Sequence, residues 1–250
     1  MKIGISVITK NRERVVNFAY NKHCQFSGAT NFIIIDDNSE VPTVLKDSEY
    51  QPYYSNEWLG VAGARNMGLA ILQDCDFIFI MDDDVFPKVN GWQNSFIRAH
   101  YYNPEQHIFI ASPNAWGEVI QDYSVLLCGE GGISQPMGAV SVKNPTGVLF
   151  FLTQHALKTL GGFEVFGKYG FEDVDYLIRA QKAGLSPLGQ YVTVKNCEDL
   201  LHICDVSGSC EGFEWEGKSV LHDTKNQLIE EARIKLTERL KDNKIFKPYK

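Results

Sequence analysis

The chain of 250 residues has 44% hydrophobic residues, 22% charged residues and a formal net charge of −7. This composition is that of a globular protein with a substantial core, and the length allows one large domain or two small ones. The negative charge argues against a nucleic-acid backbone or an anionic membrane as the main partner, although it is compatible with a small anionic ligand held locally.

Cysteine usage and hydropathy bear on the compartment. The six cysteines form no CxxC pair, which favours free thiols in a reducing compartment over a bridge between Cys204 and Cys210. The first residues read as a strand rather than as the apolar region of a signal peptide. No apolar run approaches the roughly 20 residues that span a bilayer. We therefore expect a cytoplasmic protein without a transmembrane segment.

The first half of the chain alternates strand-like and helix-like segments. Apolar runs predict strands at residues 2–9, 31–37 and 76–82, and apolar periodicity predicts helices at 12–22 and 62–75. The strands lack the alternation of a half-exposed sheet. We therefore expect a mostly parallel sheet whose two faces are covered by crossover helices.

The second half is less regular, and a glycine-rich connection is expected at residues 129–138. A loop is expected at 207–218, followed by a C-terminal helix at 219–243. The remaining expected elements are, in chain order, strands within 107–116 and 146–153, helices at 155–163 and 171–185, and a strand at 190–196. No linker, repeat or low-complexity segment interrupts this series, which favours one domain.

Two of the predicted strands end in aspartates, at Asp36 and Asp37 and again at Asp82, Asp83 and Asp84. One such cluster is as readily a solvated turn as a binding site. Its recurrence favours a site, because ligands of open α/β sheets bind beyond the carboxyl ends of the strands. Carboxylates suit Mg²⁺ or Mn²⁺, with substrate phosphates completing the shell. An extended chain would point Asp82 and Asp84 to the same side.

Further charged groups begin helices or follow strands. Arg65, expected in the first turn of a helix, opposes the macrodipole, which favours a facing anion over a plain surface arginine. Glu172 and Asp173 begin another helix among aromatic residues, either as charge complementarity or as a general base. His202 can complete a metal shell, and His222 is the second candidate.

Six segments stand in an order that resembles a known family: SVITKNR, IIIDDNS, GVAGARNMGL, FIFIMDDDV, GGFEVFGKYGFEDVDYLIRAQKAGL and LLH. Over residues 1 to about 205 they resemble the GT-A family 2 glycosyltransferases. The fifth segment is also similar to the galactosyl- and N-acetylgalactosaminyltransferase branches. The resemblance implies a GT-A (Rossmann-like) α/β/α sandwich with a mostly parallel central sheet, followed here by the C-terminal helix.

The resemblance also implies an activity and a role for each matching position. The activity is inverting, metal-dependent transfer, with Mn²⁺ or Mg²⁺, of a sugar from a nucleotide-diphosphate sugar to an acceptor hydroxyl. A UDP-hexose or UDP-N-acetylhexosamine is the expected donor, and a glycan the expected acceptor. The implied catalytic residues are Asp173 as base and Glu172 as orienting group, and the implied metal ligands are Asp84 and His202. The implied nucleotide-sugar contacts are Thr9, Asp36, Asp37, Arg65, Asp82 and Asp83.

Lys10 departs from the family pattern, which often has tyrosine there for base stacking. We expect a single domain over 1–250, with a nucleotide-binding half at about 1–100 and an acceptor-binding half at about 101–205. A lid loop and the C-terminal helix would fill 206–250. Two alternatives stay open: a sugar-nucleotide nucleotidyltransferase, which would need a glycine-rich loop after the first strand, and a non-catalytic carbohydrate-binding module of this fold.

Overall fold

The computed structural model describes most of the chain. The described residues are 1–28, 30–46, 48–111, 147–187, 191–195, 197–203 and 225–241, with the backbone of short strands at 119–122, 125–128, 134–137, 139–142, 209–210 and 213–214. In this part of the chain, no helix is both long enough and apolar enough to cross a bilayer.

A six-stranded sheet lies at the centre, in the order β3-β2-β1-β4-β11-β6. Its strands are β3 (Tyr53–Tyr54), β2 (Asn31–Asp36), β1 (Ile3–Thr9), β4 (Phe77–Asp82), β11 (Leu149–Thr153) and β6 (Ile108–Ala111). The pairs among the first four are parallel, whereas β11 is antiparallel to both of its neighbours. The predicted α/β class with a mostly parallel central sheet is confirmed.

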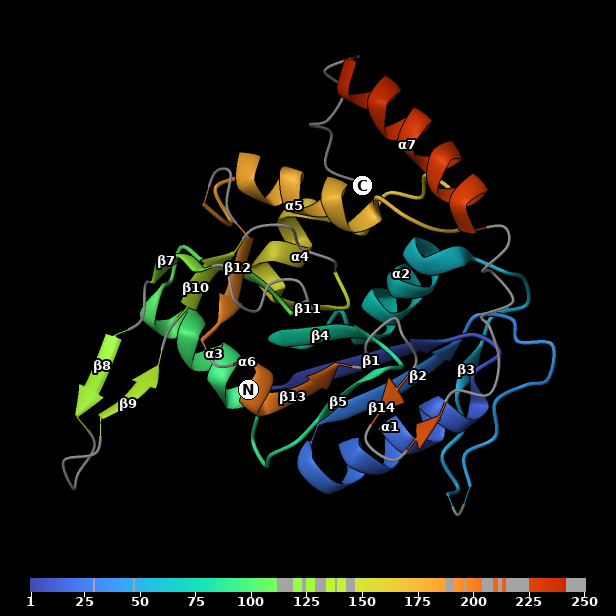
Figure 1. Ribbon diagram of the computed structural model, residues 1–250, viewed down its shortest axis with the longest axis horizontal. Coiled ribbons are helices and arrows are strands. Elements are labelled where there is room, and N and C mark those ends of the chain that lie inside the picture. The colour runs from blue at the N-terminus through green and yellow to red at the C-terminus, as the bar shows by residue number, and fades with distance from the viewer. Residues whose placement is uncertain are drawn as a thin grey trace.

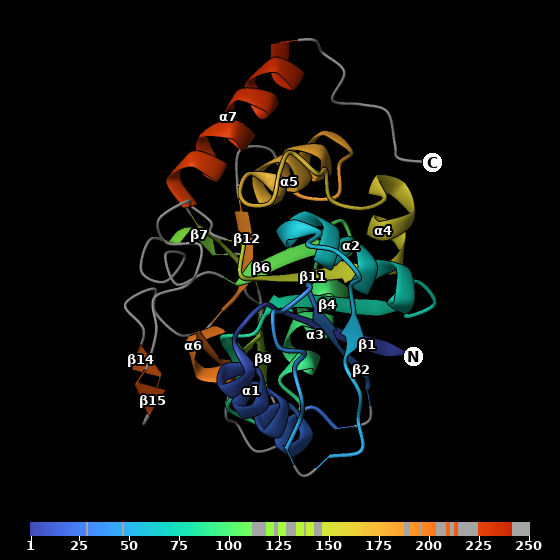
Figure 2. The same ribbon diagram turned by 90° about the vertical axis from the view of Figure 1, so that its right-hand side faces the viewer.

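Helices cover both faces of the sheet (Figures 1 and 2). One face packs on α1 (Glu13–Phe26) and α3 (Gln93–Tyr102), the other on α2 (Gly60–Leu72), α4 (Gln154–Leu160) and α5 (Glu172–Lys182). Strand β4 shows why its sequence is apolar throughout. Successive side chains of a strand point to opposite faces, so Phe79 and Met81 join one core cluster while Ile78 and Ile80 join the other.

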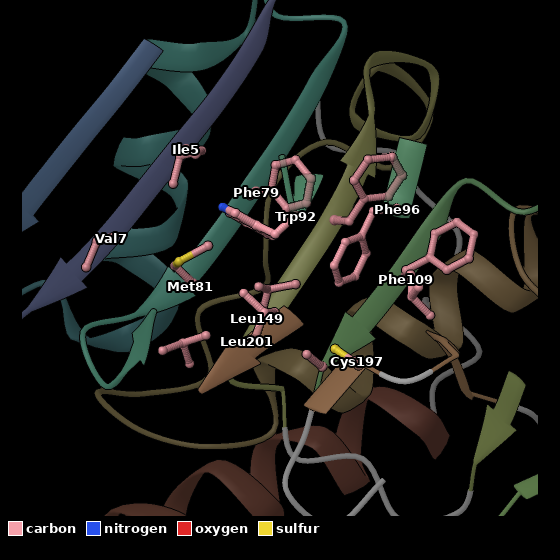
Figure 3. Close-up of a cluster of buried hydrophobic side chains, with 14 of the residues drawn as sticks. Ile5, Val7, Phe79, Met81, Trp92, Phe96, Phe109, Leu149, Cys197 and Leu201 are labelled. Atoms are coloured by element: carbon pink, nitrogen blue, oxygen red, sulfur yellow. The ribbon is translucent and has the colours of Figure 1, made fainter. Parts of the chain in front are cut away.

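A cluster of aromatic side chains fills the core on the face of the sheet that α1 and α3 cover (Figure 3). The ring of Phe79 meets Trp92 edge-on at 4.7 Å and Phe96 at 5.5 Å between centroids. Such edge-to-face pairs each contribute about 0.5–1.5 kcal/mol beyond area burial. The sequence pattern does not predict α3, because its apolar stripe is short and is interrupted by polar side chains.

Short strands surround the sheet and modify several sequence predictions. They are β5 (Val85–Pro87) paired with β13 (Leu201–Ile203); β7 (Val119–Asp122), β10 (Ala139–Val142) and β12 (Tyr191–Val194) in one sheet; β8 (Val125–Cys128) paired with β9 (Ser134–Met137); and β14 (Ser209–Cys210) paired with β15 (Phe213–Glu214). The expected connection at 129–138 thus contributes β9, and the expected loop at 207–218 contributes β14 and β15. The rest of that loop lies outside the described residues, as does His222.

Two further helices complete the described chain, α6 (Cys197–Leu200) and α7 (Lys225–Lys241). The predicted C-terminal helix is therefore present from residue 225, and residues 219–224 lie outside the described chain. Cys24, Cys75 and Cys197 are free thiols, as expected.

His23 gives the stability a specific dependence on pH. Its imidazole is buried on α1, with Nδ1 3.0 Å from Ser27 Oγ and the ring 4.9 Å from Phe32. Burial lowers its pKa to about 3, against about 6.5 in an unfolded chain. The unfolded state therefore binds the extra proton, so the stability from the neutral ring is present above about pH 6.5 and is lost as the pH falls.

Because of His23, we expect the free energy of unfolding to fall by about 2 kcal/mol when the pH is lowered from 7 to 5. Urea unfolding of the wild type and of His23→Gln at both pH values measures the effect. The variant should be less stable at pH 7 but should lose less on acidification. His155→Gln, at an exposed position beside His107, is the control and should keep most of the acid loss of the wild type. Equal acid losses in wild type and His23→Gln would refute the assignment.

Candidate active site

The carboxyl ends of β1, β2 and β4 form the candidate site. The strand register pairs Thr9 with Asp36 and Ile8 with Asp82, so both acid-ended strands terminate beside the end of β1. Because ligands of open α/β sheets bind at this edge, the residues predicted from two separate acidic clusters are brought to one place.

The three consecutive aspartates occupy different environments. Strand β4 ends at Asp82, and Asp83 and Asp84 make a turn before β5, so the expectation of a continuous extended stretch is wrong. The turn is not a solvated one either. Asp83 is only 1% exposed, and its Oδ2 accepts a 2.7 Å hydrogen bond from Thr9 Oγ1. The side chains of Asp82 and Asp84 keep 30% and 23% of their surface exposed.

Arg12 makes this acidic turn possible. Its Nη1 lies 2.7 Å from Asp83 Oδ1, and its Nη2 lies 3.2 Å from Asp84 Oδ2. Burial raises the pKa of Asp83 to about 7, against the lowering effect of the arginine. One guanidinium therefore offsets the repulsion between two adjacent carboxylates.

Arg65 connects the acidic turn to the second acidic block. It lies in the second turn of α2, not the first, and it is 2% exposed, so the reading as a surface arginine is wrong. Its Nη2 is 3.1 Å from Asp82 Oδ1, and its Nη1 is 3.2 Å from Glu172 Oε1. Nη2 also donates a 2.6 Å hydrogen bond to the carbonyl of Gly147. The anionic groups that face this arginine are thus the protein's own carboxylates.

The second acidic block begins α5. Glu172 is buried, and burial raises its pKa to about 7 although Arg65 opposes the shift. Asp173 is half-buried, and its Oδ2 accepts a 3.1 Å hydrogen bond from the N–H of Gly147. A Cβ on Gly147 would lie 2.6 Å from the Phe150 ring, so the backbone approaches both Arg65 and Asp173 where only glycine fits.

The residue before this block has an unusual backbone conformation. Phe171 has a φ of 65°, in the left-handed region, and Gly170 before it has a φ of 97°. A non-glycine residue there costs on the order of 1–3 kcal/mol and persists only where packing enforces it. The turn at Phe171 sets the direction in which α5 starts and hence the direction of Glu172 and Asp173.

Asp36 and Asp37 are both occupied by backbone groups. Asp36 accepts from the N–H groups of Ser39 at 2.9 Å and Thr43 at 2.8 Å, which holds the loop after β2. Asp37 accepts from the N–H groups of Leu59 at 2.6 Å and Gly60 at 2.9 Å. It thereby satisfies the unpaired amides at the start of α2. Each of the four carboxylate oxygens thus already accepts one backbone hydrogen bond.

The predicted metal ligands lie on neighbouring segments. His202 is on β13, opposite Phe86 of β5, and its ring stacks on that of Phe86 at 4.9 Å. Strand β5 begins directly after Asp84, whose Oδ1 is buried without a hydrogen-bond partner among the described residues. A carboxylate oxygen and an imidazole nitrogen are donors that suit Mn²⁺, so these residues fit the metal. The described residues hold no group of three or more His, Cys, Asp or Glu ready for an ion.

Several residues of the site were missed from the sequence. The basic segment after β1 could have indicated Arg12 as a partner of the aspartates. No feature of the sequence indicates that Gly147 is part of the site. Lys10 donates to the carbonyl of Asp37 at 2.9 Å, and its ammonium lies 5.4 Å from the ring of Trp58. Lys168 lies 5.6 Å from the same ring. The ring of Trp58 therefore lies beside Lys10, the residue that stands where the family pattern often has tyrosine.

Comparisons with known proteins extend this description. No protein-family model matches the chain, and no curated protein matches it. Among solved structures, TarS of S. aureus aligns with a TM-score of 0.56 and 12% identity over 83% of this chain and 37% of that one. GalNAc-T7, bound to UDP, GalNAc and Mn²⁺, aligns with a TM-score of 0.58 and 12% identity over 88% of this chain and 46% of that one.

The mannosyltransferase PcManGT from Pyrobaculum calidifontis, in complex with GDP-Man and Mn²⁺, aligns with a TM-score of 0.51 and 14% identity. That alignment covers 77% of this chain and 56% of the other. The chain spans less than two thirds of the length of each of these three proteins. The fold is therefore the GT-A α/β fold, and the structural neighbours are GT-A glycosyltransferases.

Proposed function

We propose that the chain is a glycosyltransferase that moves a sugar from a nucleotide-diphosphate sugar to an acceptor hydroxyl. One observation carries the proposal: Arg65 pairs both with Asp82, the last residue of β4, and with Glu172 at the acidic start of α5. The proposed metal ligands and the proposed general base would thus lie on one edge of the sheet, as this transfer requires. The complexes of GalNAc-T7 with UDP, GalNAc and Mn²⁺ and of PcManGT with GDP-Man and Mn²⁺ support it.

The finer assignment follows the family resemblance. The donor is a UDP-hexose or UDP-N-acetylhexosamine, the metal is Mn²⁺ or Mg²⁺, and the acceptor is a hydroxyl on a glycan. Residues 1–250 act as one domain, with the nucleotide half at about 1–100 and the acceptor half at about 101–205. The remainder, 206–250, supplies a lid loop and the C-terminal helix.

In this proposal each acidic residue has one task. Asp84 and His202 hold the divalent ion, which when bound neutralises the diphosphate leaving group. The partly exposed Asp82 contacts the ribose, and the buried Asp83 supports the turn through its bonds to Thr9 and Arg12.

Asp173 is the proposed base because it is more accessible than its neighbour. It takes the proton from the acceptor hydroxyl while that oxygen attacks the anomeric carbon from the face opposite the leaving group. A single displacement of this kind inverts the anomeric configuration. Glu172, buried and paired with Arg65, orients the sugar and Asp173.

The nucleobase end is proposed to lie beside Asp37. Asp36 holds the loop, Asp37 accepts from the base at the lone pairs left by its backbone bonds, and Thr9 flanks the base at the end of β1. Trp58, next to Lys10, offers an aromatic surface for the base. The connection from β1 to α1 contains no glycine, which disfavours the nucleotidyltransferase alternative.

A thermal-shift screen of UDP-, GDP- and dTDP-sugars, with and without Mn²⁺, tests the proposal. At a ligand concentration of about 100 times Kd, binding adds about 2.7 kcal/mol, and about 1 kcal/mol raises the Tm of a chain of this size by about 2–4 °C. We therefore expect a shift of about 5–10 °C with a UDP-sugar and Mn²⁺, and little shift with either alone.

Each other outcome identifies a competing function. No shift with any nucleotide and metal would contradict the proposal. A shift with free sugars alone would favour the carbohydrate-binding module, and a shift with a nucleoside triphosphate and a sugar phosphate would favour the nucleotidyltransferase. Release of UDP only when donor and acceptor are both present would establish turnover.

A further inference from the structure

The C-terminal helix α7 packs one face against the segment that carries the proposed base. Ile229, Ala232, Leu236 and Arg239 follow one another at intervals of three, four and three residues, which places them on one face of a helix. Ala232 and Leu236 are buried. In Figures 1 and 2, α7 lies beside α5 on the far side from the sheet.

An apolar cluster connects α7 with the N-terminal end of α5 and the segment before it. Phe166, Ala232 and Leu236 are its buried members, and Phe171 and Val174 pack against it. Phe171 is the residue whose left-handed conformation sets the start of α5. This strained residue therefore packs against a cluster to which α7 contributes Ala232 and Leu236.

Arg239 adds a charged contact at the end of the same face. Its guanidinium pairs with Glu164, and its Nε lies 3.3 Å from Asp175 Oδ1. The other oxygen of Asp175 is 2.7 Å from Nε of Arg179 on its own helix. Asp175 is thus held between two arginines, one on α5 and one on α7, in the first turn of α5.

The segment 163–171, which leads into α5, is also bonded to α2. The side chain of Asn66 donates to the carbonyl of Phe163 at 2.9 Å and accepts from its N–H at 2.7 Å. The N–H of Val61 donates to the carbonyl of Lys168 at 3.0 Å. Residues 163–171 therefore lie between α2 and α7 and lead directly into Glu172.

We propose that α7 is a clasp that positions Glu172 and Asp173, and that Arg239 is its positioning residue. The catalytic consequence rests on the proposed function, whereas the mechanical role does not. Without the clasp, Phe171 is free to leave its left-handed conformation, and the first turn of α5 shifts. A displacement of about 1 Å at a catalytic group can cost about 100-fold in rate.

The test compares Arg239→Ala and Leu236→Ala with Arg233→Ala. Arg233 is on the same helix, is 55% exposed and pairs with Glu230 one turn earlier, so it is a matched control for loss of an arginine. We expect kcat to fall about 10- to 100-fold in the two clasp variants with the donor KM within about threefold. Amide hydrogen exchange at 166–175 should accelerate in both, and Arg239→Lys should recover part of kcat.

The two readouts separate this inference from the proposed function. Faster exchange at 166–175 in the clasp variants, with Arg233→Ala unchanged, supports the clasp even if no transferase activity is found. Unchanged exchange there, or an unchanged kcat in folded clasp variants of an active enzyme, would overturn it. A rise in donor KM with kcat unchanged would also overturn it, because that pattern indicates lost binding rather than a displaced base.

Discussion

Asp173→Asn is expected to lower kcat by about 10²- to 10⁴-fold, the usual contribution of a positioned general base. The amide oxygen can still accept the hydrogen bond from the N–H of Gly147, whereas the bond that the other carboxylate oxygen accepts from the N–H of Val174 is lost. The amide cannot take a proton from the acceptor. Binding of UDP and Mn²⁺ should therefore stay near the wild-type level. Initial-rate kinetics measure kcat, and calorimetric titration of UDP with Mn²⁺ measures the binding.

Glu172→Gln separates the two members of the acidic pair. Glu172 is buried against Arg65 and has its pKa raised to about 7, so it is the alternative base. If Asp173→Asn kept wild-type kcat while Glu172→Gln lost it, the roles would have to be exchanged. The pH profile gives a second criterion, since a base with a pKa near 7 would make kcat/KM fall as the pH drops below that value.

Asp84→Ala is expected to abolish Mn²⁺-dependent nucleotide binding and to lower turnover by several orders of magnitude. The variant removes the carboxylate oxygen that is buried without a hydrogen-bond partner among the described residues. Stability without metal should change little, because the ion pair of Asp84 with Arg12 is partly exposed, and such pairs contribute about 0–1 kcal/mol. Titration with Mn²⁺ in the presence of UDP, followed by electron paramagnetic resonance, measures the binding.

Asp76→Ala is the matched control. Asp76 lies exposed just before β4, at the opposite end of the strand from Asp82, so the same chemical change is made away from the site. It should bind Mn²⁺ as the wild type does. Wild-type Mn²⁺ binding by Asp84→Ala would place the metal ligands elsewhere, and His202→Ala would then show whether β13 contributes one.

Most of the fold could be predicted from the sequence because its strands are apolar on both faces. β4 is the clearest case, since Phe79 and Ile80 enter different core clusters. The pairing of β5 with β13 could not be predicted, because strands of three residues have too little pattern to distinguish them from loops. The strand β9 was not predicted because the glycines around it are typical of a loop.

For the candidate site, the sequence predicted the edge of the sheet but not the local bonds. The aspartates at and just after the ends of β2 and β4 indicated the edge of the sheet at which these residues meet, because strand ends in a parallel sheet coincide. The pairing of Arg65 with Glu172 joins residues 107 positions apart in the chain, and no local pattern encodes such a distance. The bonds of Asp37 to the start of α2 were missed for the same reason.

Arg12 has a consequence for the order in which ligands arrive. The acidic turn already carries its own counter-ion, because the guanidinium contacts Asp83 and Asp84. A free divalent ion would meet both the repulsion of this cation and a carboxylate that is already paired. We therefore expect the divalent ion to bind the unliganded protein weakly. It should bind tightly only when nucleotide phosphates bring further oxygen ligands for the ion and a new partner for Arg12. Nucleotide and metal would then enter as one complex.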